Sequence, residues 1–228
     1  MNRRRDRAPS LRQALTERLA GDPAGAAAMD FVSQAAKDAA PDDIPELSAE
    51  DLAANLADFW RAYEKRRGPS PAIRIVPVKG PAGEDFDRLE IVQDDAPFLV
   101  RSVMGELAEQ GVAIRALFHP VVEVRRGRLG TRGESGRLRR ESMIQAIVDA
   151  VGQDREAAIL EGVKATLADV RAAVEDFEAT MALFGRTLAE LKLRAGPHGD
   201  PGEQAAFLEW LQAEHFVFLG ARTYSYPR

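Results

Sequence analysis

Apolar and polar positions alternate at the start of the segment 88–92, where Leu89 and Ile91 alternate with Arg88 and Glu90. A period of two predicts a β-strand with one buried face and one face in solvent. Over residues 97–110 the apolar positions recur every three or four residues, which predicts a helix, and over 112–126 they alternate again. The pattern therefore predicts a β-α-β unit in the middle of the chain.

Two further strands are predicted after this unit. Over residues 142–148, Met143 and Ile147 would lie on one face of a strand and Ile144 and Val148 on the other, which is typical of a strand that is buried on both faces. A second alternating segment near residues 216–226 predicts a final strand. With a helix between these two strands, the elements follow the order β-α-β-β-α-β. This order predicts an α+β fold, a ferredoxin-like antiparallel sheet with both helices on one face.

The helix between the last two strands is predicted over residues 154–193. Its apolar residues are spaced alternately by three and four, which is a heptad pattern. They are Leu160, Val163, Leu167, Val170, Val174, Phe177, Met181, Phe184, Leu188 and Leu191. A straight helix of this length extends roughly 60 Å at 1.5 Å per residue, so it must overhang the sheet, bend or meet another chain. Asp176 and Gly185 are the favoured bend points, and the pattern fits a helix pair within one chain as well as a dimer seam.

The N-terminal part of the chain is predicted to be helical. Ser48 and Asp51 stand three residues apart at the start of a helix with one apolar face, which favours a capping box. Residues 73–78 predict a short edge strand bounded by prolines. We therefore expect an N-terminal helical segment over residues 1–70 and an α+β domain over residues 71–228.

Arginine is concentrated after the central unit. Glycines and a single acid, Glu134, are interleaved with these arginines, which are Arg125, Arg126, Arg128, Arg132, Arg137, Arg139 and Arg140. A basic groove for phosphate or nucleic acid is one interpretation, and a solvated, mobile hairpin loop is the other. Nucleic-acid sites usually contain aromatic side chains that stack on bases. This segment contains none, so the pattern favours the loop.

Composition narrows the classes of function. The net charge is −5 and cysteine is absent, which excludes disulfides and cysteine-ligated metals and disfavours nucleic acid as a partner. No apolar run reaches the roughly 18 residues of a membrane span, so we expect a soluble, cytoplasmic protein. His119, His198 and His215 lack the spacing of a metal site, and we expect His119 to be structural. No glycine-rich loop precedes a helix, so we expect no catalytic residue, metal or cofactor in this chain.

Asp94 and Asp95 precede Pro97 at the start of the predicted central helix. A carboxylate followed by proline suits a helix start, because the acid accepts hydrogen bonds from free amides and proline has no amide hydrogen. The two acids could instead form a carboxylate pair for acid–base chemistry. Adjacent acids at a helix start are more often caps, which favours the first interpretation.

Four sequence blocks in a fixed order carry a resemblance to a known family. They are DDAPFLV, FHPVVEVRRGRL, ESMIQ and EWLQAEHFVFLGARTY, and the resemblance spans roughly residues 52–226. Together they resemble the N-terminal region of the large bacterial NAD-specific glutamate dehydrogenases. The chain departs from the family pattern at Ala96 and Arg101, where the family tends to carry Met and Asp, and at Gln145, where it often has His.

The resemblance implies an ACT-like fold and a non-catalytic regulatory or assembly role. In ACT domains small ligands, often amino acids, bind where the first strand turns into the first helix. Here that turn consists of Gln93, Asp94, Asp95, Ala96, Pro97 and Phe98. The alternative is a purely structural or oligomerisation domain without a ligand site, which the departures at Ala96 and Arg101 favour.

For the full-length protein, the resemblance implies an enzyme that uses NAD to deaminate L-glutamate oxidatively to 2-oxoglutarate. The glutamate- and NAD-binding residues of the family lie C-terminal to the matching segment, so none is assigned to this chain. The partners it implies are the catalytic domains of the same protein and an amino-acid effector. The heptad pattern also predicts a homo-oligomer, in which the partners are further copies of this chain.

Overall fold

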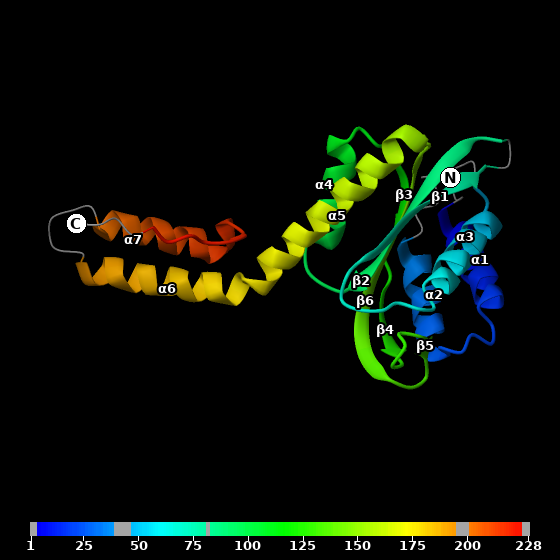
Figure 1. The fold of residues 1–228 in the computed structure, drawn as a ribbon, viewed down its shortest axis with the longest axis horizontal. Helices are drawn as coiled ribbons and strands as arrows, with labels where there is room; N and C mark the ends of the chain where they lie inside the picture. The colour runs from blue at the N-terminus through cyan, green and yellow to red at the C-terminus, as the bar shows by residue number, and fades with distance from the viewer. Residues whose placement is uncertain (1–3, 39–46, 81–82, 195–200, 225–228) are drawn as a thin grey trace. The chain divides into compact units, whose positions relative to one another are not determined.

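The computed structural model describes residues 4–38, 47–80, 83–194 and 201–224 (Figure 1). The chain forms two compact units, Met1–Leu167 and Ala168–Arg228. These units group residues that contact one another, and they do not test the domain ranges 1–70 and 71–228 inferred from the sequence. Those ranges remain predictions.

The first unit is built on a six-stranded antiparallel sheet. Its strands are β1 (Ala72–Lys79), β2 (Asp85–Asp94), β3 (Ile114–Phe118), β4 (Val121–Arg126), β5 (Arg132–Gly133) and β6 (Arg137–Asp149). They lie in the order β1-β2-β6-β4-β5, and β3 also pairs with β6. Among the described strands, β1 pairs only with β2 and is an edge strand, as its prolines predicted.

The strand predicted over residues 112–126 is two strands in the structure. β3 and β4 are separated at His119 and Pro120, where proline cannot donate to the ladder, and both pair with β6. β6 accommodates both because it is 13 residues long. It also contains the buried run that was predicted over residues 142–148, and every residue of that run is buried.

Helices cover both faces of the sheet. Those of the first unit are α1 (Arg4–Arg18), α2 (Ala26–Asp38), α3 (Ala49–Ala62), α4 (Leu99–Glu109) and the first part of α5 (Gln153–Glu175). Figure 1 shows α1 to α3 on one side of the sheet and α4 with the start of α5 on the other. A hydrogen bond joins α4 and α5: the hydroxyl of Thr166 in α5 donates to the carboxylate of Glu106 in α4 at 2.8 Å.

β2 is buried on both faces, which corrects the prediction of one solvent-facing side. Arg88 and Glu90, the charged residues of its alternating pattern, are only 2% and 0% exposed. α3 covers them: Arg88 donates to the Asn55 side chain at 2.6 Å and to Asp58 at 2.9 Å. Nε of Arg88 also lies 2.7 Å from the Glu90 carboxylate. The polar face is therefore buried with its charges paired.

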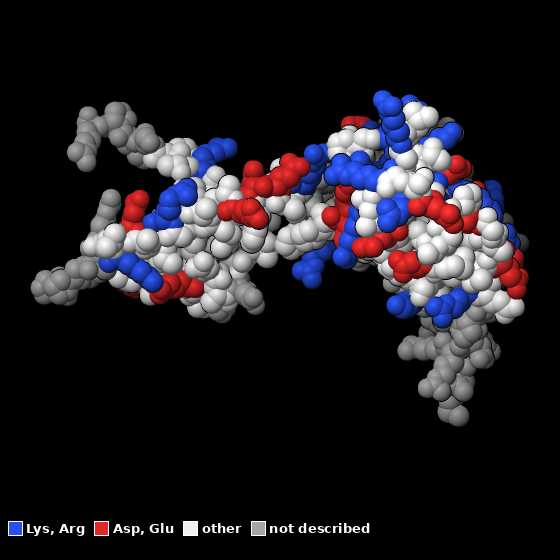
Figure 2. Space-filling view, turned by 90° about the horizontal axis from the view of Figure 1, so that it is seen from below, with Lys and Arg blue, Asp and Glu red and all other residues white. Residues whose placement is uncertain are grey.

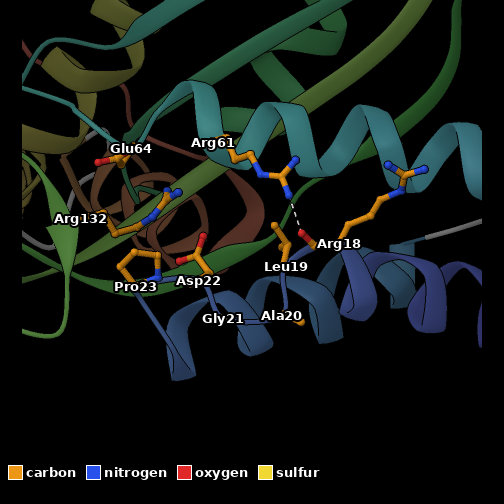
Figure 3. Close-up of a pocket in the computed structure, with 9 residues that line it drawn as sticks. All are labelled: Arg18, Leu19, Ala20, Gly21, Asp22, Pro23, Arg61, Glu64 and Arg132. Atoms are coloured by element: carbon orange, nitrogen blue, oxygen red, sulfur yellow. Dashed lines mark hydrogen bonds between the residues drawn. The ribbon is translucent and has the colours of Figure 1, made fainter.

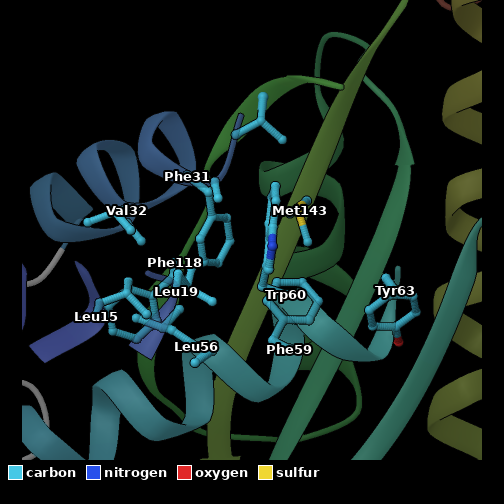
Figure 4. Packing of buried hydrophobic residues seen from close by; sticks show 14 of the residues in the cluster. Leu15, Leu19, Phe31, Val32, Leu56, Phe59, Trp60, Tyr63, Phe118 and Met143 are labelled. Atoms are coloured by element: carbon cyan, nitrogen blue, oxygen red, sulfur yellow. The ribbon is translucent and has the colours of Figure 1, made fainter. Parts of the chain in front are cut away.

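Aromatic residues of α2 and α3 form the centre of the core on this side (Figure 4). The ring centroids of Phe31 and Trp60 are 4.8 Å apart, and Phe59 meets Tyr63 edge-on at 5.5 Å. Met143 of β6 belongs to the same buried cluster. The N-terminal helices and the sheet therefore share one hydrophobic core.

The capping box predicted at the start of α3 is confirmed. Ser48 Oγ accepts a hydrogen bond from the Asp51 amide at 3.1 Å, and the Asp51 carboxylate accepts one from the Ser48 amide at 3.0 Å. Each side chain thus binds an amide that has no partner within the helix.

Replacing Ser48 with alanine is expected to lower the free energy of unfolding by about 1 kcal/mol, because the cap hydrogen bond is lost. Urea denaturation followed by circular dichroism measures this change. Ser135→Ala is the control, since Ser135 is exposed in a loop. Equal unfolding midpoints for the two variants would show that the capping box contributes nothing.

In the second unit, the predicted long helix is interrupted at one of its two predicted bend points. α5 ends before Asp176, and α6 (Phe177–Arg194) begins after it, whereas Gly185 lies inside α6. α7 (Pro201–Trp210) packs against α6 and continues as a short π-helix, η1 (Leu211–His215).

α6 and α7 form a helix pair within one chain. Lys192 of α6 lies 2.5 Å from the carboxylate of Glu209 in α7. In α6, the heptad position Leu188 is buried, but Phe177 remains 47% exposed. The apolar positions of α6 are therefore only partly covered inside this unit.

The final strand predicted near residues 216–226 is not formed over 216–224, the part that the structure describes. Phe218 instead packs against Phe184 of α6, with ring centroids 4.8 Å apart. β2 is paired on both sides, with β1 and β6. The fold is α+β as predicted, but the ferredoxin-like order β-α-β-β-α-β is not confirmed.

Candidate functional site

Arginine side chains bind both acids of the turn at residues 93–98. Asp94 Oδ1 accepts hydrogen bonds from Arg66 at 2.8 Å and from Arg139 at 3.2 Å. The Asp95 carboxylate lies 3.0 Å from Nε of Arg140. The interpretation of these acids as helix caps was therefore wrong, because arginines after α3 and in β6 bind them instead.

The Asp94 carboxyl stays ionised at neutral pH. Its partial burial alone would raise its pKa, because burial disfavours the charged form. The hydrogen bond and charge of Arg66, with a further contribution from Arg139, outweigh burial and hold this pKa below its ordinary value. The turn therefore begins with a fixed negative charge.

α4 begins without a side-chain cap. Its N-cap residue is Phe98, whose side chain makes no capping hydrogen bond and whose backbone is left-handed, with φ 71°. This conformation is uncommon for a residue other than glycine and is often found at ligand-binding turns. Of the neighbouring turn residues, Pro97 is exposed, Ala96 is half-buried and Gln93 is buried. The turn thus presents backbone amides and the positive end of a helix dipole.

Glu141 joins two buried arginines on the side of the sheet covered by α3. It is fully buried, and it accepts hydrogen bonds from Arg66 at 2.9 Å and from Arg126 at 2.7 Å. It lies opposite Asp94 across β2 and β6, and Asp94 also binds Arg66. Part of the arginine-rich segment is therefore buried and paired, which corrects the interpretation of it as a solvated loop.

A pocket of about 420 Å³ lies beside this network, and we call it the arginine pocket. Its lining consists of arginine and glycine alone: Arg66, Arg67, Gly68, Arg126, Gly127, Arg128, Gly130, Gly136, Arg137 and Arg139. Gly136 has φ +115°, and a Cβ there would lie 2.3 Å from the carbonyl oxygen of Arg126. Glycine is therefore required at this turn of the hairpin.

A second pocket, of about 310 Å³, lies between the end of α1, the turn that follows it and α3 (Figure 3). Basic side chains of Arg18, Arg61 and Arg132 line it together with the acids Asp22 and Glu64. Unlike the arginine pocket, it contains charges of both signs.

Arg132 is the most constrained cation of this second pocket. It is 4% exposed, and its guanidinium lies 3.3 Å from the centroid of the Trp60 ring. Its Nη1 has no hydrogen-bond partner among the residues that the structure describes. Burial, followed by the nearby charge of Arg126, lowers the pKa of Arg132 to about 9. Arg132 thus remains a cation at neutral pH and stabilises the Trp60 ring through a cation–π contact.

Arg66 and Glu141 were not among the site residues predicted from the sequence. Arg66 lies in the run of charged residues that ends the helix before it, and Glu141 directly precedes the buried run of β6. An acid at the border of a buried strand needs a cationic partner, because an unpaired buried charge is costly. That rule predicts a partner for Glu141 but does not identify Arg66.

Within the described ranges, no group of three or more histidine or acidic residues is placed to hold a metal ion. His119 is half-buried and bonds the Ser142 hydroxyl at 2.7 Å, as a structural histidine does. His198 lies outside the described residues, and the side chain of His215 is not described. In the same ranges, no helix combines the length and apolarity needed to cross a membrane.

Comparison with known proteins identifies the family. The model of the family described as "Glutamate dehydrogenase, ACT1 domain" matches residues 31–163. The NAD-specific glutamate dehydrogenase of Pseudomonas aeruginosa is 29% identical over 204 residues, which cover 81% of this chain and 12% of the relative. That of Halomonas elongata is 28% identical over 246 residues, covering 97% of this chain and 14% of the relative. The chain thus spans only a small part of the length of these relatives. Because the family model matches more than half of it, the chain belongs to the glutamate dehydrogenase ACT1 domain family.

Proposed function

We propose that this chain is the non-catalytic N-terminal regulatory domain of an NAD-dependent glutamate dehydrogenase and that it binds an amino-acid effector at the turn 93–98. The family match supports the first part, and its range, residues 31–163, includes the turn. On this proposal, the full-length protein converts L-glutamate to 2-oxoglutarate in the cytoplasm. NAD binds in its C-terminal catalytic domains, which are partners of this domain.

The single observation that carries the effector site is the uncapped start of α4 at Phe98. Backbone amides and the helix dipole suit the carboxylate of an amino acid. Asp94 and Asp95 lie within the same turn, where the ammonium group would share their carboxylates with the arginines that bind them. Carboxylate and ammonium recognition at opposite ends of one turn is what a zwitterion requires.

A structural or oligomerisation domain is the second candidate, and a specific observation favours it. Large apolar side chains of the second unit are exposed to solvent, and such surface is typical of an interaction site. They are Phe177, Leu193, Phe207, Trp210, Phe216, Val217, Leu219 and Tyr224. The catalytic domains or another copy of the chain are the partners this surface suits. Sedimentation of the chain over a range of concentrations tests self-association.

Calorimetric titration of the chain with glutamate, aspartate and branched-chain amino acids tests the effector site. One of them is expected to bind saturably. Asp95→Asn should weaken that binding about tenfold to a hundredfold, the effect of losing a hydrogen bond to a charged group. Asp85→Asn is the control, because Asp85 begins β2 far along the strand from the turn. If no amino acid binds, or if the two variants bind with equal affinity, the structural role is the only one of the two functions that remains.

A further inference from the structure

We propose that the arginine pocket binds a small anion that carries two or more phosphate groups. This site lies beside the effector turn, takes a different class of ligand and goes beyond the proposed function. It rests on the gathering of arginines by the β4–β6 hairpin, on their unbalanced charge and on the residues that line the pocket.

The sheet register gathers the basic side chains on one face. Arg126 lies opposite Arg137 across β4 and β6, and Val124 lies opposite Arg139. Residues opposite each other in an antiparallel pair point to the same face, as do residues two apart along a strand. The backbone of the hairpin therefore places the side chains of Arg126, Arg137 and Arg139 on one face before any ligand binds.

Two carboxylates neutralise only part of the positive charge of the arginines that line the pocket. Asp94 and Glu141 form ion pairs with the arginines on the buried side, which are Arg66, Arg126 and Arg139. The remaining arginines of the lining are exposed, and no carboxylate in the described ranges pairs with them. They are Arg67, Arg128 and Arg137.

These three cations define the class of ligand. Like charges around one pocket repel, and a compact anion removes that repulsion. Each phosphate group carries about −1.5 to −2 charge near neutral pH, so two of them balance three guanidinium groups. The planar guanidinium also binds phosphate oxygens in pairs. A volume of about 420 Å³ lies within the usual range for small-molecule sites.

The same observations disfavour nucleic acid as the ligand. The pocket lining contains no aromatic side chain on which a base could stack. Among the described residues on the face seen in Figure 2, basic and acidic side chains are intermixed and form no continuous basic surface. A localised pocket suits a small anion, whereas a strand of nucleic acid requires an extended basic track.

The pocket shares two arginines with the effector turn. Arg66 and Arg139 line the pocket, and both bind Asp94, the first acid of the turn. An anion that binds Arg139 competes with Asp94 for the same guanidinium. Occupation of the pocket is therefore expected to change the amide chemical shift of Asp94.

Calorimetric titration of the chain with inorganic pyrophosphate, at constant ionic strength, tests the proposal. Saturable binding is expected, and Arg137→Gln should weaken it about tenfold to a hundredfold, the loss that follows removal of a charged hydrogen-bond donor. Arg137 is exposed and lies outside the buried ion pairs, so this variant should fold. Arg101→Gln is the matched control, an exposed arginine of α4 that does not line the pocket.

Absence of saturable binding, or equal affinities of the Arg137→Gln and Arg101→Gln variants, overturns the proposal. Tighter binding of a single-stranded oligonucleotide, with an affinity that rises with its length, also overturns it in favour of a nucleic-acid surface. Amino acids take no part in this titration. Its failure is therefore distinguishable from failure of the effector site.

Discussion

Replacing Glu141 with glutamine is expected to lower the free energy of unfolding by about 3–5 kcal/mol, the usual cost of removing one partner from a buried ion pair. Glu141 is 0% exposed and binds both Arg66 and Arg126. Glutamine has nearly the same shape but no charge. Arg126 is then left buried without a counter-charge, and Arg66 retains only Asp94.

Urea denaturation followed by circular dichroism measures this loss. Glu123→Gln is the matched control, since Glu123 is an exposed acid of the neighbouring strand β4 and should change stability by less than about 0.5 kcal/mol. If the two variants unfold at the same urea concentration, Glu141 does not hold the two arginines as described.

Trp60→Ala is expected to destabilise the first unit by a similar amount, about 3–5 kcal/mol, because it leaves a large cavity in the aromatic core. The ring is fully buried against Phe31, and its Nε1 donates to Asp22 at 2.8 Å. Removal of the indole also exposes one face of the Arg132 guanidinium, which lies over the ring.

The control for this substitution is Trp210→Ala, at the only other tryptophan of the sequence. Trp210 lies in α7 of the second unit and is 48% exposed. Circular dichroism suits both variants, since each loses a fluorophore. A Trp60→Ala protein as stable as the Trp210→Ala protein would contradict the shared core of the N-terminal helices and the sheet.

Periodicity predicted the elements of the first unit better than it predicted their surroundings. The alternation at Leu89 and Ile91 correctly placed β2, and the apolar residues on both faces of the segment 142–148 correctly placed the core of β6. Arg88 and Glu90 were expected in solvent because a local pattern cannot reveal α3, which comes from an earlier part of the chain and covers them. Burial of charged residues depends on such distant packing.

The candidate turn shows the same limit. The sequence placed Asp94 and Asp95 beside the start of a helix, which is correct, but their partners are Arg66, Arg139 and Arg140. Arg66 lies 28 residues from Asp94. Sequence spacing identifies local caps, and it cannot identify an ion pair formed by the meeting of two distant segments.

The pattern near residues 216–226 failed for another reason. Alternation of apolar residues predicts a strand only where a sheet edge can pair with it. Over 216–224 the chain has no such pairing, and Phe218 packs against a helix. The break of the heptad helix at Asp176, in contrast, was one of two predicted positions.

Amide chemical shifts of the isotope-labelled chain, recorded during titration with amino acids, test the central claim most directly. If an amino-acid effector binds this ACT1-family domain, saturable shift changes are predicted for residues 93–98 and for the first turn of α4. The amide of Phe98, at the uncapped start of the helix, should be among those that move. No change over residues 93–98 with glutamate, aspartate or any branched-chain amino acid would contradict the effector site.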